Sequence, residues 1–216
     1  VPVKVKKEIV EFKRDEYPKE GVTAESVAKL KGAFPVGPES PNPQVVHTFE
    51  PKGIQEAEDK GTQRVTAANA SGINDAGAAM IIASEEFVKA NGLKPLAKVR
   101  AWGSVGCDPS IMGVGPIEST RQALSRAGLT VADLDLIESN EAFAAQAAAV
   151  NRELGFDMDK VNVNGGAIAL GPPIGAAGCR ITTTLIYEMI KRDLTIGLAT
   201  MCIGGGMGCA TIVERD

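Results

Sequence analysis

Leu134-Asp135-Leu136-Ile137-Glu138, followed after Ser139 by Asn140-Glu141-Ala142-Phe143-Ala144, is the stretch of sequence that decides the fold. Leu134–Glu138 has the length and composition of a short buried strand, and Glu141–Leu154 those of a helix. The same alternation continues on both sides of this unit. Strands that alternate with helices of about 10 to 15 residues are typical of a layered α/β domain.

We expect the remaining elements after residue 95 to be the strand Ala97–Trp102, the helix Ile117–Ala127, the strand Val161–Asn164, the helix Gly175–Arg192, and the strands Ile196–Ile203 and Met207–Val213. The order is therefore β-α-β-α-β-α-β-β. Only Gly204-Gly205-Gly206 separates the last two strands, which favours an antiparallel hairpin.

The helix expected at Gly175–Arg192 is unusual in its polarity. It opens with small residues, and its continuation from Ile181 to Ile190 offers little clear polar face. A helix that is apolar nearly all round is buried. The remaining chain is too small to surround it, so we expect a partner layer that this sequence does not supply.

The first 92 residues are less regular. Proline and glycine punctuate residues 1–60, where we expect a short helix at Ala24–Lys31 and a long surface excursion at Phe34–Lys60. Residues 71–83 suit a buried helix followed by a strand, and Glu85–Asn91 a short helix that stops at Gly92. We divide the chain into a loop or insertion region at 1–60, the end of a neighbouring domain at 61–92, and the layered domain at 93–216.

Composition excludes several classes of protein. The net charge is -4 with no long run of like charge, so nothing indicates a nucleic-acid partner. With 4 cysteines, no C-x-x-C pair and only His47, a zinc site is not expected. Reduced thiols in the cytosol or an equivalent compartment fit this cysteine usage. No apolar run reaches the length of about 18 to 20 residues that crosses a bilayer.

Three segments stand out as candidate site material, and each also has a purely structural interpretation. Asn140 follows a strand and precedes a helix, where it could serve as an ordinary N-cap. The glycine-rich run from Asn162 to Gly178 lacks the Gly-Lys-Ser/Thr of a P-loop, and could be a tight crossover. Cys202 stands beside the glycine turn at 204–206, and could be a small buried apolar residue.

Taken together and in order, these segments resemble one family. Asn140-Glu141-Ala142-Phe143-Ala144, Gly165-Gly166-Ala167-Ile168-Ala169-Leu170-Gly171 and Cys202-Ile203-Gly204-Gly205-Gly206-Met207-Gly208 closely resemble segments of the biosynthetic thiolases, the acetyl-CoA acetyltransferases. Residues 68–75 and 108–113 resemble the family as well. The resemblance covers nearly all of residues 61–216, more loosely 1–34, and corresponds to the carboxyl-terminal half of a thiolase.

The resemblance implies a fold, a reaction and roles for residues. It implies the thiolase fold, with 93–216 as the C-terminal layered α-β-α domain, 61–92 as the last piece of the N-terminal domain and 1–60 as part of the loop region. It implies condensation of two acetyl-CoA to acetoacetyl-CoA and the reverse thiolysis, in fatty acid metabolism, in the cytoplasm, by a homo- or hetero-oligomer. Coenzyme A thioesters are substrates, and neither a cofactor nor a metal is implied.

By position, Cys202 matches the family's second cysteine, which moves the α-proton of the substrate. Asn140 matches the asparagine that helps to build an oxyanion hole. Gly171 and Gly204 match active-site turns. The residues that match positions lining the coenzyme A and acyl pocket are Phe34, Ser71, Met112, Ala142 and Phe143.

Two departures from the family pattern stand out. The segment with the nucleophilic cysteine belongs to the amino-terminal half, which we expect as a partner, and no other cysteine here sits in a matching context. The family's Gly-His-Pro reads Gly171-Pro172-Pro173, so Pro172 occupies the position of the histidine that activates the nucleophile. Proline carries neither an imidazole nor a backbone N–H. We therefore expect the isolated chain to be inactive.

Three interpretations remain open. The chain is half of a thiolase that acts with an amino-terminal half, or a binding protein that has kept the acyl-CoA pocket without thiolysis, or a structural subunit that completes a partner's layers. The presence of Asn140 and Cys202 favours the first interpretation. Pro172 favours the other two.

Overall fold

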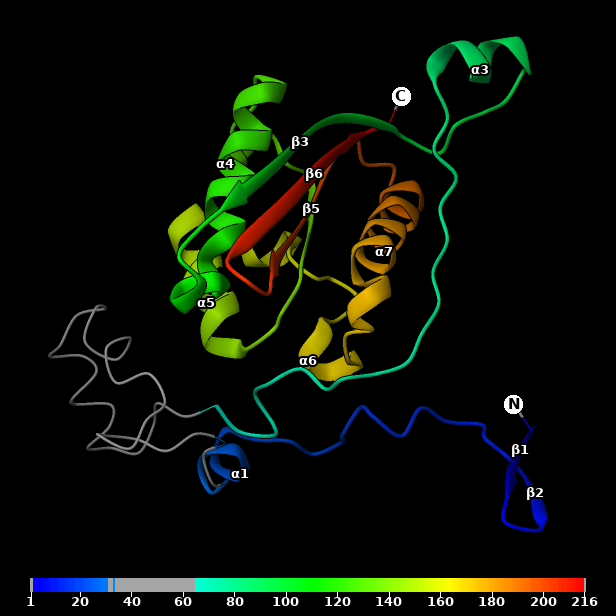
Figure 1. Cartoon of the computed structure of the whole chain (residues 1–216), viewed down its shortest axis with the longest axis vertical. Coiled ribbons are helices and arrows are strands. Elements are labelled where there is room, and N and C mark those ends of the chain that lie inside the picture. The colour runs from blue at the N-terminus through cyan, green and yellow to red at the C-terminus, as the bar shows by residue number, and fades with distance from the viewer. Residues whose placement is uncertain (1, 31–32, 34–64, 216) are drawn as a thin grey trace, which may run out of the picture.

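A four-stranded sheet carries the chain after residue 95, in a computed structural model that describes residues 2–30, 33 and 65–215. The strand order is β3-β6-β5-β4 (Figure 1). β6 (Met207–Glu214) pairs antiparallel with both β3 (Lys98–Gly106) and β5 (Ile196–Ile203). β4 (Leu136–Ser139) pairs parallel with β5. The expected hairpin of the last two strands is confirmed.

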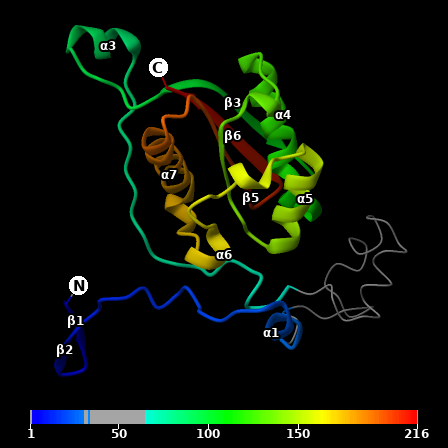
Figure 2. The same cartoon turned by 180° about the vertical axis from the view of Figure 1, so that it is seen from behind.

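Helices cover the two faces of the sheet unequally. α4 (Gly115–Ala127) packs on β3, β6 and β5, and α5 (Ala144–Leu154) lies on the same side (Figures 1 and 2). α7 (Ala177–Arg192) packs on β5 and β4 from the other side. One buried apolar cluster lies under α4 and α5 and includes Leu198 and Ile212. A second cluster lies under α7 and includes Leu136 and Leu185. The layered α/β architecture expected from the sequence is confirmed.

The other described elements are short. They are β1 (Pro2–Val5) and β2 (Glu8–Glu11), which pair antiparallel, α1 (Ala24–Ala28), α3 (Glu85–Ala90), α6 (Ala167–Leu170), and 3₁₀ helices at Pro109–Val114, Val131–Asp133, Met158–Lys160 and Ile174–Ala176.

Local sequence explains where the long helices stop. α4 and α5 end at Gly128 and Gly155, which take the left-handed conformation with φ of 67° and 66°. Glycine adopts this conformation without the steric penalty of a Cβ, so both helices close their last turn there. α7 ends in the same way at Asp193, with φ of 54°, so a glycine pattern alone does not locate its end.

The strand expected at Val161–Asn164 is wrong beyond its first residue. Val161 forms a single parallel bridge with Ile137, and the next residue, Asn162, turns to φ 48°. The Asn162 side chain then takes the place of a neighbouring strand. Its Oδ1 accepts from the Ser139 N–H at 2.8 Å, and its Nδ2 donates to the Ser139 carbonyl at 2.8 Å. A side-chain amide therefore completes the edge of β4.

The helix and strand expected over residues 71–83 are also wrong for this chain. Residues 71–84 form no regular element, and Ile81 and Ile82 are 96% and 80% exposed. An apolar run cannot form a strand without another strand to pair with. α1 is shorter than the helix expected at Ala24–Lys31, and the β1–β2 hairpin was not anticipated. The excursion expected at Phe34–Lys60 and the isolated His47 lie outside the described residues.

The face of the sheet beneath α7 is only half covered. Ala101 and Gly103 of β3 point towards α4, so Trp102 between them points to the α7 face, where it is 60% exposed. Within the described ranges, no helix lies over β3 on this face (Figure 1). α7 itself buries Ile181, Leu185 and Met189 against the sheet but leaves Tyr187 59% exposed. We expected α7 to be buried nearly all round, but only the side that faces the sheet is buried.

Gly103 allows the close approach of β3 and α4. A Cβ at this position would lie 2.0 Å from the carbonyl oxygen of Ser119, which is backbone and cannot move aside cheaply. We predict that Gly103→Ala lowers the free energy of unfolding by about 1–3 kcal/mol, the usual range for overpacking. Urea unfolding measures this, with Gly204→Ala as the matched control because a Cβ at 204 meets nothing within 4 Å. Equal stability of the two variants would contradict the packing described.

Candidate active site at the strand ends

Asn140 lies one residue beyond the end of β4, where the chain leaves the sheet. Its N–H donates to the carbonyl of Thr200 on β5 at 2.9 Å, which continues the parallel pairing of the two strands by one residue. The residue is 8% exposed, and its side-chain oxygen Oδ1 is buried without a hydrogen-bond partner among the described residues. A buried amide oxygen in this state is poised to accept a hydrogen bond from a bound molecule or water.

Cys202 lies near the end of β5. Leu198 and Thr200 of β5 face α4, so alternation places Cys202 on the α4 face, under the 3₁₀ helix at Pro109–Val114. Its partner across the hairpin, Gly208, lies against Gly115 on the same face. Burial raises the pKa of the Cys202 thiol, and the neighbouring Cys107 raises it further. The neutral thiol therefore predominates, and the thiolate left when its proton is removed is a stronger base than that of an ordinary cysteine.

Asn140 and Cys202 thus come to the same end of the sheet from neighbouring strands. Glu138, two residues before Asn140, faces α7, whereas Cys202 faces α4. A cavity that both side chains share must therefore lie beyond the strand ends, where the chain leaves the sheet. That they share one stays a prediction.

The segment that carries Pro172 lies beside Asn140. Glu141 accepts a hydrogen bond at Oε2 from the N–H of Ile168, in α6, at 3.1 Å. Gly171 follows α6 with φ of 82°, and Pro172 is buried. The Pro172 carbonyl accepts from the N–H of Asn74 at 3.2 Å. Residue 172 therefore stands between the 65–84 segment and the start of α7.

The predicted pocket residues are joined by hydrogen bonds. The N–H and hydroxyl of Ser71 both donate to the carbonyl of Ala142, at 3.1 and 3.0 Å, and Phe143 forms an isolated bridge with Ala70. The side chain of Gln146 accepts from the Ala142 N–H at 3.1 Å and donates to the Gly113 carbonyl at 3.0 Å, next to Met112.

The residues Ser71, Met112, Ala142 and Phe143 are all half-buried, and three separate segments bring them together. Gly204 lies exposed in the β5–β6 turn. Phe34 lies outside the described residues.

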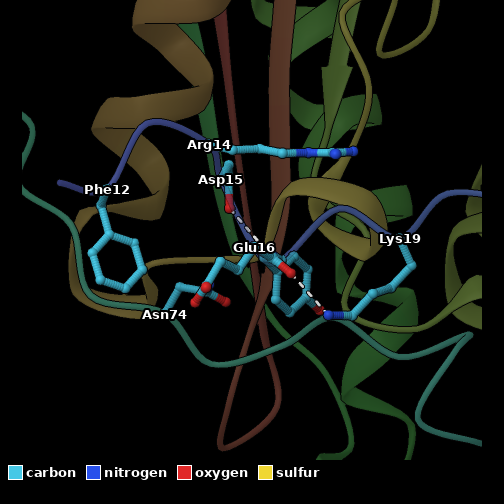
Figure 3. Close-up of a pocket in the computed structure, with 7 residues that line it drawn as sticks. Phe12, Arg14, Asp15, Glu16, Lys19 and Asn74 are labelled. Atoms are coloured by element: carbon cyan, nitrogen blue, oxygen red, sulfur yellow. Dashed lines mark hydrogen bonds between the residues drawn. The ribbon is translucent and has the colours of Figure 1, made fainter. Parts of the chain in front are cut away.

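Two open hollows flank this junction. One, of about 460 Å³, is lined by Phe12, Arg14, Asp15, Glu16, Tyr17, Lys19 and Asn74 (Figure 3). Its cationic groups are engaged locally, since Lys19 Nζ donates to the Glu16 carbonyl at 2.8 Å and Arg14 pairs with Glu20. The other, of about 420 Å³, is lined by residues 74–78 and 173–176 together with Cys179. None of the predicted site residues that the structure describes lines either hollow.

A group of charged side chains lies behind Asn140, on the α7 face. Glu138 is 1% exposed and pairs with Arg180 of α7, with Oε2 and a guanidinium nitrogen 3.5 Å apart. Burial raises the pKa of Glu138 to about 7; Arg180 opposes the shift, and Glu141 and Glu188 add to it. Glu188 keeps a lowered pKa because Asn164 and Arg192 donate hydrogen bonds to it.

This arrangement can supply one acceptor and one proton donor at neighbouring strand ends. Among the described residues no group of three or more His, Cys, Asp and Glu side chains could hold a metal ion, and no helix is long and apolar enough to span a membrane. No imidazole stands at position 172.

Sequence reasoning passed over Asn74, Asn162 and Gln146. Each joins segments that are far apart in the sequence. Asn74, in the family-like segment 68–75, and Asn162, in the glycine-rich run, stood in segments that carried a signal, whereas Gln146 did not.

Comparison with known proteins identifies the family. Residues 93–215 match the family model described as thiolase, C-terminal domain. An acetyl-CoA acetyltransferase from Allochromatium vinosum is 51% identical over 94% of this chain and 45% of its own length. The crystal structure of the Bacillus anthracis acetyl-CoA acetyltransferase superposes with a TM-score of 0.78 at 42% identity, over 99% of this chain and 48% of that one. The crystal structure of human mitochondrial 3-ketoacyl-CoA thiolase in complex with CoA superposes with a TM-score of 0.75 at 38% identity. The superposition covers 100% of this chain and 48% of that one.

The chain belongs to the thiolase family and has its fold. It corresponds to the C-terminal half, since residues 93–215 match the C-terminal domain, and it spans about half the length of the curated relatives that it matches.

Glu138 makes a pH-dependent contribution to stability. Its folded pKa of about 7 lies above the ordinary 4.5, so the carboxyl is protonated more readily in the folded chain, and stability is lost as pH rises between these values. We predict that Glu138→Gln removes this loss, so that its stability relative to the parent chain rises from pH 4.5 to 7 by up to about 3 kcal/mol. Urea unfolding across this range measures the difference. Glu153→Gln, at an exposed position, is the control, and parallel pH profiles for all three chains would contradict the assignment.

Proposed function

We propose that this chain is the C-terminal half of a thiolase-type acyltransferase, an acetyl-CoA C-acetyltransferase that condenses two acetyl-CoA to acetoacetyl-CoA and catalyses the reverse thiolysis. The observation that supports the proposal is that neighbouring strands carry Asn140 and Cys202 to the same end of the sheet, beside the glycine segment. The names of the relatives, which are acetyl-CoA acetyltransferases and a 3-ketoacyl-CoA thiolase, support the same chemistry. The setting that we propose is the cytoplasm, in fatty acid metabolism.

The chemistry assigns different work to the two residues. Condensation requires a carbanion beside a thioester, so a group over the α-carbon must take its proton. Cys202 does this as its thiolate, which is a stronger base than that of an ordinary cysteine because burial raises the pKa of the thiol, and the thiol so formed carries the proton back in the reverse direction. Asn140 helps to stabilise the developing oxyanion, with its orphaned Oδ1 holding a water that donates to the oxyanion. Ser71, Met112, Ala142 and Phe143, with Phe34, line the pocket for the acyl chain and coenzyme A.

Acyl transfer itself needs a nucleophile that this chain does not carry. We propose that an amino-terminal thiolase half supplies it, and that residues 65–92 belong to the domain which that half builds. The apolar surfaces left bare by the fold support this, namely the α7-side face of β3, the outer side of α7, and Ile81 and Ile82. The assembled protein is an oligomer of the same or different chains, with coenzyme A thioesters as substrates and no further cofactor.

Pro172 favours a second candidate, an acyl-CoA-binding or structural subunit without catalysis. Pro172 is buried, and its backbone carbonyl accepts a hydrogen bond from the Asn74 N–H. The fold therefore accommodates proline at this position. The ring can neither take a proton from a nucleophile nor donate a hydrogen bond.

An activity assay separates the two candidates. General acid–base assistance is typically worth about 10²- to 10⁴-fold, so we predict no measurable thiolysis of acetoacetyl-CoA by the isolated chain or by its Pro172→His variant. Turnover should appear when Pro172→His is combined with the amino-terminal half of the Allochromatium vinosum relative. The unmodified chain with that half should be slower by about this factor. Turnover by the unmodified chain alone contradicts the proposal, and an inactive Pro172→His complex favours the non-catalytic candidate.

Trp102 reports directly on the partner layer. It is the only tryptophan of the chain and is 60% exposed on the half-covered face of the sheet. We predict that adding an amino-terminal half whose own tryptophans are replaced by phenylalanine shifts its fluorescence to shorter wavelength and slows quenching by iodide, because burial removes the indole from water. A concentration series of the chain alone is the control for pairing with a second copy. A complex that forms while Trp102 stays fully quenchable contradicts the surface assigned.

A further inference from the structure

Asn140 is held in place by its neighbours more than by its own side chain. Its Oδ1 has no partner in the described part of the chain, and its backbone N–H makes one bond, to Thr200. Ser139 and Glu141, on either side, are by contrast tied to the glycine-rich segment. The position of the Asn140 side chain therefore depends on those two ties.

The first tie is the side chain of Asn162. Its amide bonds both the N–H and the carbonyl of Ser139, at 2.8 Å each, and so fixes the orientation of the peptide units around Ser139. The left-handed backbone of Asn162 turns the side chain back towards β4, and its own N–H donates to the Ile137 carbonyl at 2.9 Å. Asparagine tolerates this conformation better than most residues.

The second tie is the carboxylate of Glu141. Oε1 accepts from Asn162 Nδ2 at 3.3 Å, and Oε2 accepts from the Ile168 N–H at 3.1 Å. Gly166 lies directly against it, since a Cβ there would come within 2.1 Å of Oε2. One carboxylate therefore joins the strand-end residue, the amide that completes β4 and the α6 helix that leads to residue 172.

We propose that Glu141 and Asn162 are positioning residues that hold Asn140 for its role in the oxyanion site, and that they couple its placement to the segment carrying residue 172. The effect of these residues on catalysis rests on the proposed function, in which Asn140 helps to stabilise the oxyanion. A preorganised acceptor or donor loses its value when it is free to move, because it must then be ordered during the reaction.

Two conservative variants break the ties without removing volume. In Glu141→Gln, one amide nitrogen must face either Ile168 N–H or Asn162 Nδ2, so two donors meet and one bond is lost. In Asn162→Asp, the donor to the Ser139 carbonyl is replaced by an acceptor, and a second negative charge stands beside Glu141. Glu153→Gln makes the same chemical change as the first variant at an exposed site on α5 and is the matched control.

Hydrogen exchange of the 216-residue chain tests the ties themselves. We expect the amides of Ser139 and Ile168 to exchange at least ~10-fold faster in Glu141→Gln and Asn162→Asp, a loss of about 1.4 kcal/mol of local protection. The core amide of Leu198 should be unchanged, and Glu153→Gln should match the parent throughout. Unchanged exchange at Ser139 and Ile168 overturns the proposal, because it shows that the two ties do not protect these amides. An equal rise at Leu198 also overturns it, because the variants then lower the stability of the whole domain and not the local ties.

Kinetics of the assembled Pro172→His protein test what the ties do. We expect kcat for thiolysis to fall by about 10- to 100-fold in both variants, as when outer-shell partners of a site are removed, with KM changed by less than about threefold. In an Asn140→Ala background, Glu141→Gln should then change kcat by less than about twofold, because a residue that acts through Asn140 has nothing left to position.

Additive losses in the Asn140→Ala background, or an unchanged kcat, overturn the positioning role. Absence of turnover in the assembled parent protein overturns the proposed function, and the positioning role with it. The exchange result still decides separately whether the two ties exist.

Discussion

Helices cover both faces of the sheet at β4 and β5 but only one face at β3. This unequal covering decides which apolar surfaces of the chain are left exposed. α4 reaches across β3, β6 and β5, whereas α7 packs mainly on β5 and β4 and shares its apolar cluster with Val213 of β6. Trp102, the outer side of α7 and the apolar run around Ile81 are left facing water as a result. Surfaces of this kind on a protein of this size mark places where another polypeptide packs. The occupant that we propose for them is an amino-terminal thiolase half, since the chain spans about half the length of the curated relatives that it matches.

The same imbalance explains why the candidate site is only partly built. The strand ends that carry Asn140 and Cys202 are well ordered by sheet pairing and by the Asn162 and Glu141 ties. The two hollows nearby are open and lined by residues other than those that the family pattern selects. The carboxyl ends of β4 and β5 therefore bring an orphaned acceptor and a neutral thiol to one end of the sheet. In our proposal the nucleophile and one wall of the pocket come from the amino-terminal half. Pro172 lies between the 65–84 segment, which we assign to the amino-terminal domain, and the start of α7.

Most of the layered domain could be predicted from the sequence, because its information is local. Helix ends at Gly128 and Gly155 and the tight β5–β6 hairpin need no knowledge of distant residues. Three failures were non-local. Residues 71–83, expected as a helix followed by a strand, find no partner strand among the residues that the structure describes. The strand expected at 161–164 ends early because the Asn162 side chain replaces backbone pairing, which no periodicity reveals.

The third failure concerns the site. Sequence motifs indicated Asn140 and Cys202, and the structure brings both to one end of the sheet. It also shows that β5 turns Cys202 towards α4 while Glu138 of β4 faces α7. The roles of Asn74 and Gln146 were not anticipated, although Asn74 lies in the family-like segment 68–75, because they bond to carbonyls about a hundred and about thirty residues away in the chain.

The central claim is that the apolar surfaces of this chain are the contact surface for an amino-terminal thiolase half. Hydrogen exchange of the amides of residues 79–83, with and without that half, tests it most directly. These residues form no strand in the isolated chain, so their amides should exchange rapidly. If the run becomes a strand in the sheet of the partner, exchange should slow by several orders of magnitude, as for core strands. Rapid exchange at residues 79–83 within a stable, purified complex would contradict the account.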